Sequence, residues 1–398
     1  MIHFFIILRT IDLTWFFKSV YLNLVVFRVR DFIVKDLLDK IRADIFTDET
    51  LAITQEGMDD VGVFELVDTL KTNTHIKSIN LSYNAITDEG VKALAALPQL
   101  VFIDLSSNQV GPVGARCLSE LSTLQELKLS ANPIGNESTV HFFKNTQLIS
   151  LYLDECDLDE MSVSLLAQNK TLKTLSLSNN RISPEAVIAF PEHSQLTSLD
   201  LSQNQLSDAN TLEIFKIKGL KSLNLSSNCI EDSGARVLAT MESLEDLVLS
   251  QNRITEQGVR YLFESKSIKR LQVVNNRIKF DRPEPLPHNG SLLEINLTCN
   301  NIDDRCEEVL KSLASIPTIE KLNLSHNKIG EIGTEILYRF QSKSLQLIDL
   351  SSNRVSKRAP VDAIEERPTK NIRVDVPVSD SKIKEDMAKP PINRKLVK

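Results

Sequence analysis

The sequence predicts an α/β solenoid, in which short parallel strands line the concave side of a horseshoe and short helices cover its convex side. The first observation is a recurring pattern, L-x-x-L-x-L-x-x-N-x-I, with a copy that begins at Leu172. Further copies begin at Ile76, Leu100, Leu124, Leu148, Leu196, Leu220, Leu244, Ile268, Leu292, Ile319 and Leu345. The second is their spacing: every step from 76 to 292 is 24 residues, and the last two steps are 27 and 26. A fixed period of this length is typical of stacked-repeat folds.

The first part of each repeat is expected to be a strand. In the central copy Leu175 and Leu177 lie two positions apart, so both should face the core. Thr174, Ser176 and Ser178 should then face the concave side. Neighbouring copies would place their strands side by side in one parallel sheet.

An asparagine ends each predicted strand and turns inward, where its amide must find hydrogen-bond partners on the backbones of neighbouring repeats. The predicted ladder contains Asn84, Asn108, Asn132, Asn180, Asn204, Asn228, Asn252, Asn276, Asn300, Asn327 and Asn353, with Cys156 in the one remaining place. Cysteine is small and donates weakly, so we expect Cys156 to be structural rather than reactive. Asn136 is expected at an ordinary loop position outside the ladder.

The return limb of each repeat is expected to be a short helix. Residues 87–90 supply polar cap residues and a glycine, and Val91, Leu94 and Leu97 follow at helical spacing. With this limb, residues 50–356 resemble the leucine-rich repeat superfamily, and the helices resemble its ribonuclease-inhibitor-like subclass, whose repeats are longer, at about 28 residues. Short repeats with phrases such as 73–76, Asn-Thr-His-Ile, are similar to those of leucine-rich repeat effectors of intracellular bacterial pathogens.

The residues divide the chain into four segments. Residues 1–30 are an apolar segment, for which three interpretations stay open: a cap on the first repeat, a mis-set start codon, or membrane contact. Residues 31–75 are expected to form a helical cap and a degenerate first repeat. Residues 76–356 form twelve leucine-rich repeats, and 357–398 form a charged, disordered tail, either a linker or a secretion signal.

One repeat departs from the pattern. Its return limb contains Pro283, Pro285 and Pro287 at alternate positions, which a helix interior does not accommodate. We therefore expect an extended limb there, either an exposed docking edge or a spacer on the convex side.

Composition and motifs exclude several functions. The net charge of −7 argues against general binding of nucleic acid. The five cysteines are scattered without a C-x-x-C motif, which favours a reducing compartment. The sequence contains no phosphate-binding loop, dinucleotide fingerprint, nucleophile elbow or zinc-protease motif. We expect no catalytic residue, no cofactor and no metal site.

What remains is the concave surface, where most strand positions carry Ser, Asn or Thr. The exceptions are the candidate partner-binding residues: Phe102, Asp104, Glu126, Lys128, Tyr152, Asp154, Asp246, Val248 and Arg270. Phe102 and Tyr152 should lie two strands apart, about 10 Å at the strand spacing of a sheet. Exposed aromatic residues rimmed by charge are common anchors of protein interfaces.

The sequence therefore predicts a monomeric, cytoplasmic, non-enzymatic module that binds a protein partner on its concave face. The resemblance adds delivery into a host cell as a secreted bacterial effector. Two alternatives stay open: a regulator of a small GTPase, because Ran GTPase-activating proteins share the repeat subclass, and a membrane-tethered adaptor that uses residues 1–30.

Overall fold

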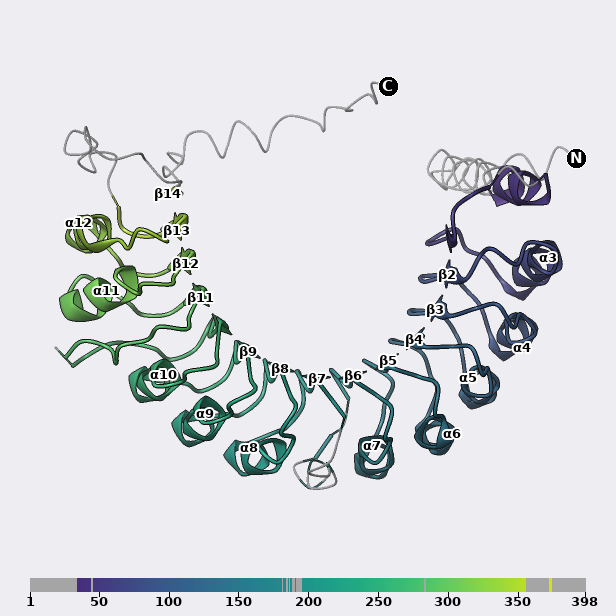
Figure 1. Ribbon diagram of the computed structural model, residues 1–398, viewed down its shortest axis with the longest axis horizontal. Helices are drawn as coiled ribbons and strands as arrows, with labels where there is room; N and C mark the ends of the chain where they lie inside the picture. The colour runs from purple at the N-terminus through teal and green to yellow at the C-terminus, as the bar shows by residue number, and fades with distance from the viewer. Residues whose placement is uncertain are drawn as a thin grey trace, which may run out of the picture. The chain divides into compact units, whose positions relative to one another are not determined.

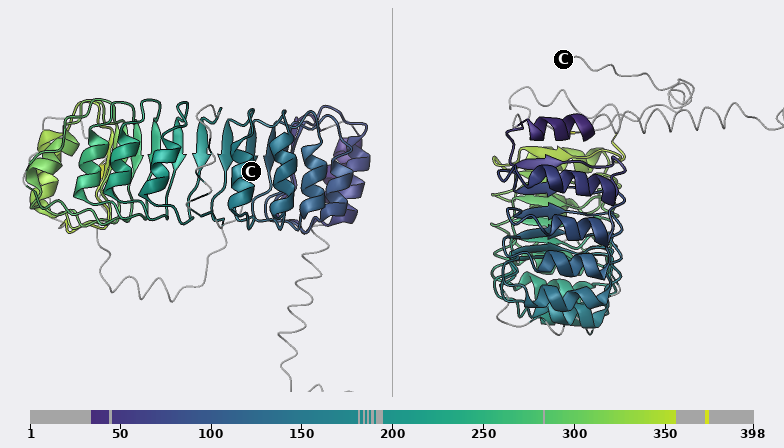
Figure 2. Two further views of the ribbon diagram at one scale, coloured as in Figure 1. Left: turned by 90° about the horizontal axis from the view of Figure 1, so that it is seen from below. Right: turned by 90° about the vertical axis from the view of Figure 1, so that its right-hand side faces the viewer.

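The computed structural model describes residues 34–43, 46–180, 182–183, 185, 187, 190, 195–282, 284–355 and 372–373. It divides into two compact units, Met1–Arg181 and Ile182–Lys398, which are described separately. In each unit the strands form one layer and the helices another (Figure 1 and Figure 2). Each unit is thus an open solenoid with a parallel sheet on one side and short helices on the other, which confirms the predicted fold class.

The first unit contains six strands that pair in parallel and in chain order. They are β1 (Thr50–Ala52), β2 (Ser78–Asn80), β3 (Phe102–Asp104), β4 (Glu126–Lys128), β5 (Ser150–Tyr152) and β6 (Thr174–Ser176). The return limbs hold α3 (Asp60–Leu70), α4 (Asp88–Leu94), α5 (Pro112–Ser119), the 3-10 helix η1 (Asn136–Ser138), α6 (Thr139–Lys144) and α7 (Glu160–Ala167).

Within the second unit the strands also pair in parallel and in chain order. Its strands are β7 (Ser198–Asp200), β8 (Ser222–Asn224), β9 (Asp246–Val248), β10 (Arg270–Gln272), β11 (Glu294–Asn296), β12 (Lys321–Asn323), β13 (Leu347–Asp349) and β14 (Ile372–Arg373). Its helices are α8 (Asp208–Ile214), α9 (Asp232–Ala239), α10 (Glu256–Phe263), α11 (Glu307–Ala314) and α12 (Glu331–Phe340).

The core consists of the apolar positions of the repeat. Leu175 and Leu177 are fully buried, and so are the matching residues of the other repeats, such as Ile103 and Leu105. Burying a leucine side chain contributes roughly 1.5–3 kcal/mol, so the stacked rows supply most of the stabilisation. Strands β1 to β13 are only three residues long because the chain soon turns through a residue with positive φ, such as Ser107 at 56°.

The ladder asparagines join each repeat to its neighbours. In Asn108, Nδ2 donates to the carbonyl oxygens of Leu81 and Leu105 at 2.9 Å each, and Oδ1 accepts from the amide of Ile86 at 3.0 Å. Corresponding bonds recur at the other predicted asparagines. Because one amide satisfies backbone groups of two repeats, the residue is both a turn and a cross-link.

Cys156 fills the ladder position incompletely. Its Sγ donates to the carbonyl oxygens of Leu129 and Asp154, at 3.3 and 3.4 Å. A thiol offers no amide oxygen, and the amide of Ile134 instead donates to the carbonyl of Asn132 at 2.9 Å. Burial raises the pKa of Cys156 to about 12, so the thiol stays protonated at neutral pH.

Aspartates at the start of the helices form a second cross-link, which we name the aspartate clasp. The Oδ1 atom of Asp88 accepts from the amides of Gly111 and Gly114, at 2.7 and 2.9 Å. A methyl group on Gly114 would lie 2.7 Å from that oxygen, which explains the recurring glycine. The members of the clasp are Asp60, Asp88, Asp208, Asp232 and Asp304.

Asn136 occupies the clasp position of the third repeat, so its assignment to an ordinary loop was wrong. Its Oδ1 accepts from the amide of Asp159 at 3.0 Å and from Oγ of Ser162 at 2.7 Å. Its Nδ2 donates to a carboxylate oxygen of Asp159 at 2.8 Å. Asn136, the first residue of η1, is thus a polar bridge between two repeats.

The ends of the chain are described only in part. Residues 34–42 are helical, with Leu38 and Ile41 buried, and Arg42 pairs with Glu65 of α3 at 2.9 Å. Within the predicted tail, Ile372 and Arg373 pair with β13. The interpretations of residues 1–30 and of the rest of the tail fall outside the described residues. No helix among the described residues is long and apolar enough to cross a membrane.

Candidate functional site

The predicted binding residues of the first unit lie on three neighbouring strands. Strand register sets Phe102 beside Glu126, and it sets Asp104, Lys128 and Tyr152 in one row. Phe102 and Tyr152 are therefore two strands apart, with Lys128 on the strand between them. We name Phe102, Glu126, Lys128 and Tyr152 the aromatic patch.

A lysine links the two rings of the aromatic patch. The Nζ atom of Lys128 lies 5.3 Å from the ring centroid of Phe102 and 5.0 Å from that of Tyr152. Both distances are within the range of cation–π attraction. Glu126 pairs with the same ammonium at 3.6 Å. The four side chains, all half-buried, therefore restrain one another before any partner arrives.

The environment of Tyr152 disfavours its phenolate. Burial raises the pKa of the Tyr152 hydroxyl above its ordinary value, and the charges of Glu126 and Asp154 raise it further. The residue therefore stays neutral at physiological pH. It presents an apolar ring with a hydroxyl that can donate a hydrogen bond, a combination suited to a protein interface.

The two aspartates of the predicted site are built into the sheet. Asp104 is only 9% exposed, and its Oδ1 accepts from the amide of Ser106 at 2.9 Å. Asp154 accepts from Oγ of Ser130 at 2.9 Å, from the amide of Ser178 at 2.8 Å and from Oγ of Ser176. These bonds orient both carboxylates.

A shallow hollow of about 390 Å³ adjoins the aromatic patch. Asp104, Asp154, Glu155 and Tyr83 are among its lining residues. Tyr83 is 58% exposed and occupies the positive-φ position before the ladder asparagine, with φ of 60°. Sequence reasoning missed Tyr83, although no other repeat has a tyrosine, phenylalanine or tryptophan at this position, which was a usable signal.

The remaining predicted residues belong to the second unit. Val248 is the last residue of β9, whereas Asp246 and Arg270 belong to a row of alternating charge. Asp246, Arg270, Glu294 and Lys321 lie side by side at the first position of β9 to β12. Arg270 donates to Asp246 at 2.7 Å, which raises the pKa of the Arg270 guanidinium, and Lys321 pairs with Glu294 at 2.7 Å.

This charged row differs from the aromatic patch because it contains no aromatic ring. The sequence predicted Asp246, Val248 and Arg270 but missed Glu294 and Lys321, because each looks unremarkable until the register aligns them. The four charges are already paired with one another. A partner would have to replace these ion pairs, so the row offers less binding energy than the aromatic patch.

The limb with the prolines is held by a buried ion pair. Glu256 and Arg260 of α10 are 8% and 9% exposed, and their side chains pair at 2.8 Å. Arg260 also donates to the carbonyl oxygens of Glu284 and Pro285, at 2.9 and 2.8 Å. Glu256 accepts from the amide of Asp281 at 2.9 Å. The described part of the limb contains no helix, as the prolines predicted.

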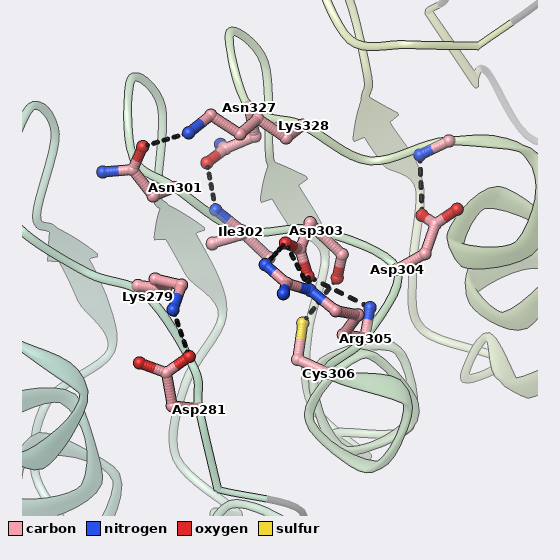
Figure 3. A network of polar contacts seen from close by, with 11 residues as sticks. Lys279, Asp281, Asn301, Ile302, Asp303, Asp304, Arg305, Cys306, Asn327 and Lys328 are labelled. Carbon is pink, nitrogen blue, oxygen red and sulfur yellow. Dashed lines mark hydrogen bonds and ion pairs between the residues drawn. The ribbon is translucent and has the colours of Figure 1, made fainter.

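The cysteines and acids do not assemble a metal site among the described residues. Cys306 is the N-cap residue of α11, and its Sγ donates to the carbonyl oxygen of Asp303 at 2.9 Å (Figure 3). Burial raises the pKa of Cys306 to about 12. The carboxylate of Asp303 pairs with Arg305, whose hydrogen bond lowers the pKa of Asp303. These groups satisfy one another locally.

Comparison with family models identifies repeats of one kind. A model described as "Leucine rich repeat" matches residues 194–254, and a second one, "Leucine Rich repeat", matches residues 72–95, 98–119, 168–190 and 315–334. No curated protein matches the chain.

Solved structures with similar folds come from bacteria and plants. An internalin of Listeria monocytogenes, InlF, is 19% identical with a TM-score of 0.47, over 85% of this chain and 94% of that one. The ectodomain of the Arabidopsis thaliana receptor kinase GASSHO1/SCHENGEN3, in complex with CASPARIAN STRIP INTEGRITY FACTOR 2, is 22% identical with a TM-score of 0.45, over 75% of this chain and 41% of that one. The Arabidopsis receptor kinase HAESA, in complex with the peptide hormone IDA and the co-receptor SERK1, is 20% identical with a TM-score of 0.41. The match covers 72% of this chain and 51% of that one.

Proposed function

Because the chain is a leucine-rich repeat protein, we propose that it is a non-catalytic module that binds a protein partner through the aromatic patch on the sheet face of its first unit. Leucine-rich repeats are generally protein-interaction modules, which supports the class of function. The observation that carries the location is the ammonium of Lys128 held between the rings of Phe102 and Tyr152. A rigid, half-exposed cluster loses little conformational freedom on binding, so more of its contact energy appears as affinity.

The test is the affinity of a partner captured by pull-down with the full chain and identified by mass spectrometry. Phe102→Ala/Tyr152→Ala should weaken binding by about 2 kcal/mol or more, roughly thirtyfold, because aromatic anchors dominate interface energies. Phe340→Ala is the matched control, since Phe340 is another exposed ring beneath a lysine, with Nζ of Lys311 at 5.2 Å from its centroid, but on α12. Full affinity in the double variant, with an unchanged melting curve, would move the site elsewhere.

The biological setting is proposed on the sequence alone. The protein acts as a monomer in a cytoplasm, and as a secreted effector it would reach the cytosol of a host cell and bind a host protein there. Its short repeats support this setting. Translocation of a reporter fused to the full chain tests it, and failure to appear in host cells would remove the effector role without touching the binding proposal.

The alternatives have weaker support. A GTPase regulator would need accessible arginines, and Arg253, whose side chain is 48% exposed, is a candidate, although it pairs with Glu231 at 3.3 Å. A GTP hydrolysis assay with candidate small GTPases decides this alternative. The membrane-tethered adaptor depends on residues 1–30, and flotation of the full chain with liposomes decides it.

A further inference from the structure

The hollow beside the aromatic patch contains a buried carboxylate without a counter-charge. Asp104 lines the hollow and is 91% buried, from the 9% exposure of its side chain and backbone together. Within the described residues the only hydrogen bond to its carboxylate is the one that the amide of Ser106 donates to Oδ1 at 2.9 Å. Its register neighbour Lys128 pairs with Glu126 and not with Asp104. A buried carboxylate in this situation gains from an added cation.

A matched aspartate shows that this situation is not imposed by the repeat. Asp200 ends β7 as Asp104 ends β3, and it accepts from the amide of Ser202 at 2.8 Å as Asp104 accepts from Ser106. Its second oxygen accepts from Nδ2 of Asn224 at 2.8 Å. The side chain on the next strand thus satisfies Asp200, whereas Lys128 on the next strand from Asp104 is turned to Glu126 and the rings.

The hollow also carries an aromatic rim and an excess of negative charge. Tyr83 lines it, and the amide of Tyr83 donates to the carbonyl of Ser106 at 2.8 Å, the residue whose own amide binds Asp104. The exposed ring and the buried carboxylate are therefore tied to the same short backbone segment. Asp154 and Glu155 line the hollow as well, without a basic residue among the lining side chains.

We propose that this hollow accepts an arginine side chain of the protein partner, an inference that rests on the proposed function for its partner. The guanidinium would pair with Asp104 and stack on the ring of Tyr83, two interactions that a planar cation makes together. Asp154 and Glu155 add a negative field that draws the cation in. The adjoining rings of Phe102 and Tyr152 would contact apolar groups beside that arginine.

The test uses small probes with the full chain, so that no partner is needed. N-acetyl-arginine amide is titrated against protein with labelled alanine methyl groups, and the signal of Ala131, which lines the hollow, is followed by NMR. We expect saturable shifts with the arginine probe and none with N-acetyl-citrulline amide, which has the same shape without the charge. Equal shifts from both probes, or no shift from arginine, would overturn the proposal.

Two variants locate the binding groups. Asp104→Asn should weaken the arginine probe at least about tenfold, because it removes the buried charge, whereas Asp200→Asn should leave it unchanged. Tyr83→Ser installs the residue found at the same turn position as Ser107 and Ser227, so it should fold and still bind more weakly. Undiminished binding in both Asp104→Asn and Tyr83→Ser would refute the site even if the aromatic double variant loses its partner. If Asp104→Asn loses binding of the arginine probe while Phe102→Ala/Tyr152→Ala keeps full affinity for the partner, the arginine site in the hollow is supported. The proposal that the aromatic patch binds the partner is then wrong.

Discussion

At the scale of single residues, the ladder shows how one side chain fixes the geometry of two repeats. Asn204 donates from Nδ2 to the carbonyl oxygens of Leu201 and Ser202, at 3.1 and 2.9 Å, and accepts from the amide of Ile182 at 3.3 Å. At the same ladder position, Cys156 donates hydrogen bonds from Sγ to two carbonyl oxygens, but it has no amide oxygen that could accept from a backbone amide. An incomplete substitute is tolerated because the orphaned amide of Ile134 finds a carbonyl in its own turn.

The ladder makes a prediction about stability. Asn204→Leu removes the amide while keeping a similar volume, so buried backbone groups lose their partners, at a cost of about 1–3 kcal/mol or more. Gln205→Ala is the neighbouring control, because Gln205 is exposed, and it should change stability by less than about 0.5 kcal/mol. Urea unfolding of the two variants measures the difference. Equal shifts in midpoint would mean that the ladder amide carries no special weight.

At the scale of elements, the proline-containing limb shows how a repeat without its helix stays in the stack. Phe280 and Leu286 remain buried and keep an apolar face toward the core. The extended backbone has lost its helical hydrogen bonds, and Arg260 of α10 supplies donors for two of its carbonyl groups. The neighbouring helix therefore replaces part of the missing one.

This arrangement predicts a large effect of one arginine. Arg260→Met leaves the carboxylate of Glu256 buried and unpaired, so we expect a loss of about 3–5 kcal/mol and faster proteolysis within 279–290. Arg253→Met removes an exposed pair with Glu231, whose side chains are 48% and 58% exposed, and should cost close to nothing. Urea unfolding and limited proteolysis provide the comparison. A small effect of Arg260→Met would show that water or the limb itself compensates for the missing guanidinium.

At the scale of the whole molecule, the sequence specified the repeats far better than it specified their surface. The 24-residue period identified the strands, the buried leucines and the ladder, because these depend on one-dimensional spacing. The clasp role of Asn136 was missed, since it appears only when the next repeat brings Asp159 and Ser162 against it. The position of Lys128 between two rings depends on a choice of rotamer, which periodicity does not encode.

The buried pair of Glu256 and Arg260 was missed for a related reason. Their spacing of four residues looks like an ordinary surface pair on a helix. The pair is buried because the proline-containing limb packs against it, and the 24-residue period does not specify the contacts of that limb. Long polar side chains therefore remain the least predictable part of this fold, and Glu126 and Lys128 of the aromatic patch are among them.

The last prediction concerns the N-terminal end of the stack, where the helix at 34–42 contributes Leu38 and Ile41 to the core. Deleting residues 1–46 should remove that apolar surface and the pair between Arg42 and Glu65, exposing α3. Two buried side chains suggest a loss of about 3 kcal/mol or more, with a tendency to aggregate. Differential scanning calorimetry and light scattering measure both effects.

Deletion of residues 1–30 alone is the control, because it spares the helix at 34–42, and its outcome separates the three interpretations of that segment. A cap on the first repeat requires a lower melting temperature. A segment outside the native protein requires an unchanged, monomeric product. Membrane contact requires unchanged melting together with lost binding to liposomes. If the 1–46 deletion melts like the full chain, the helix at 34–42 is not the cap, and the edge at β1 and α3 must be stable on its own.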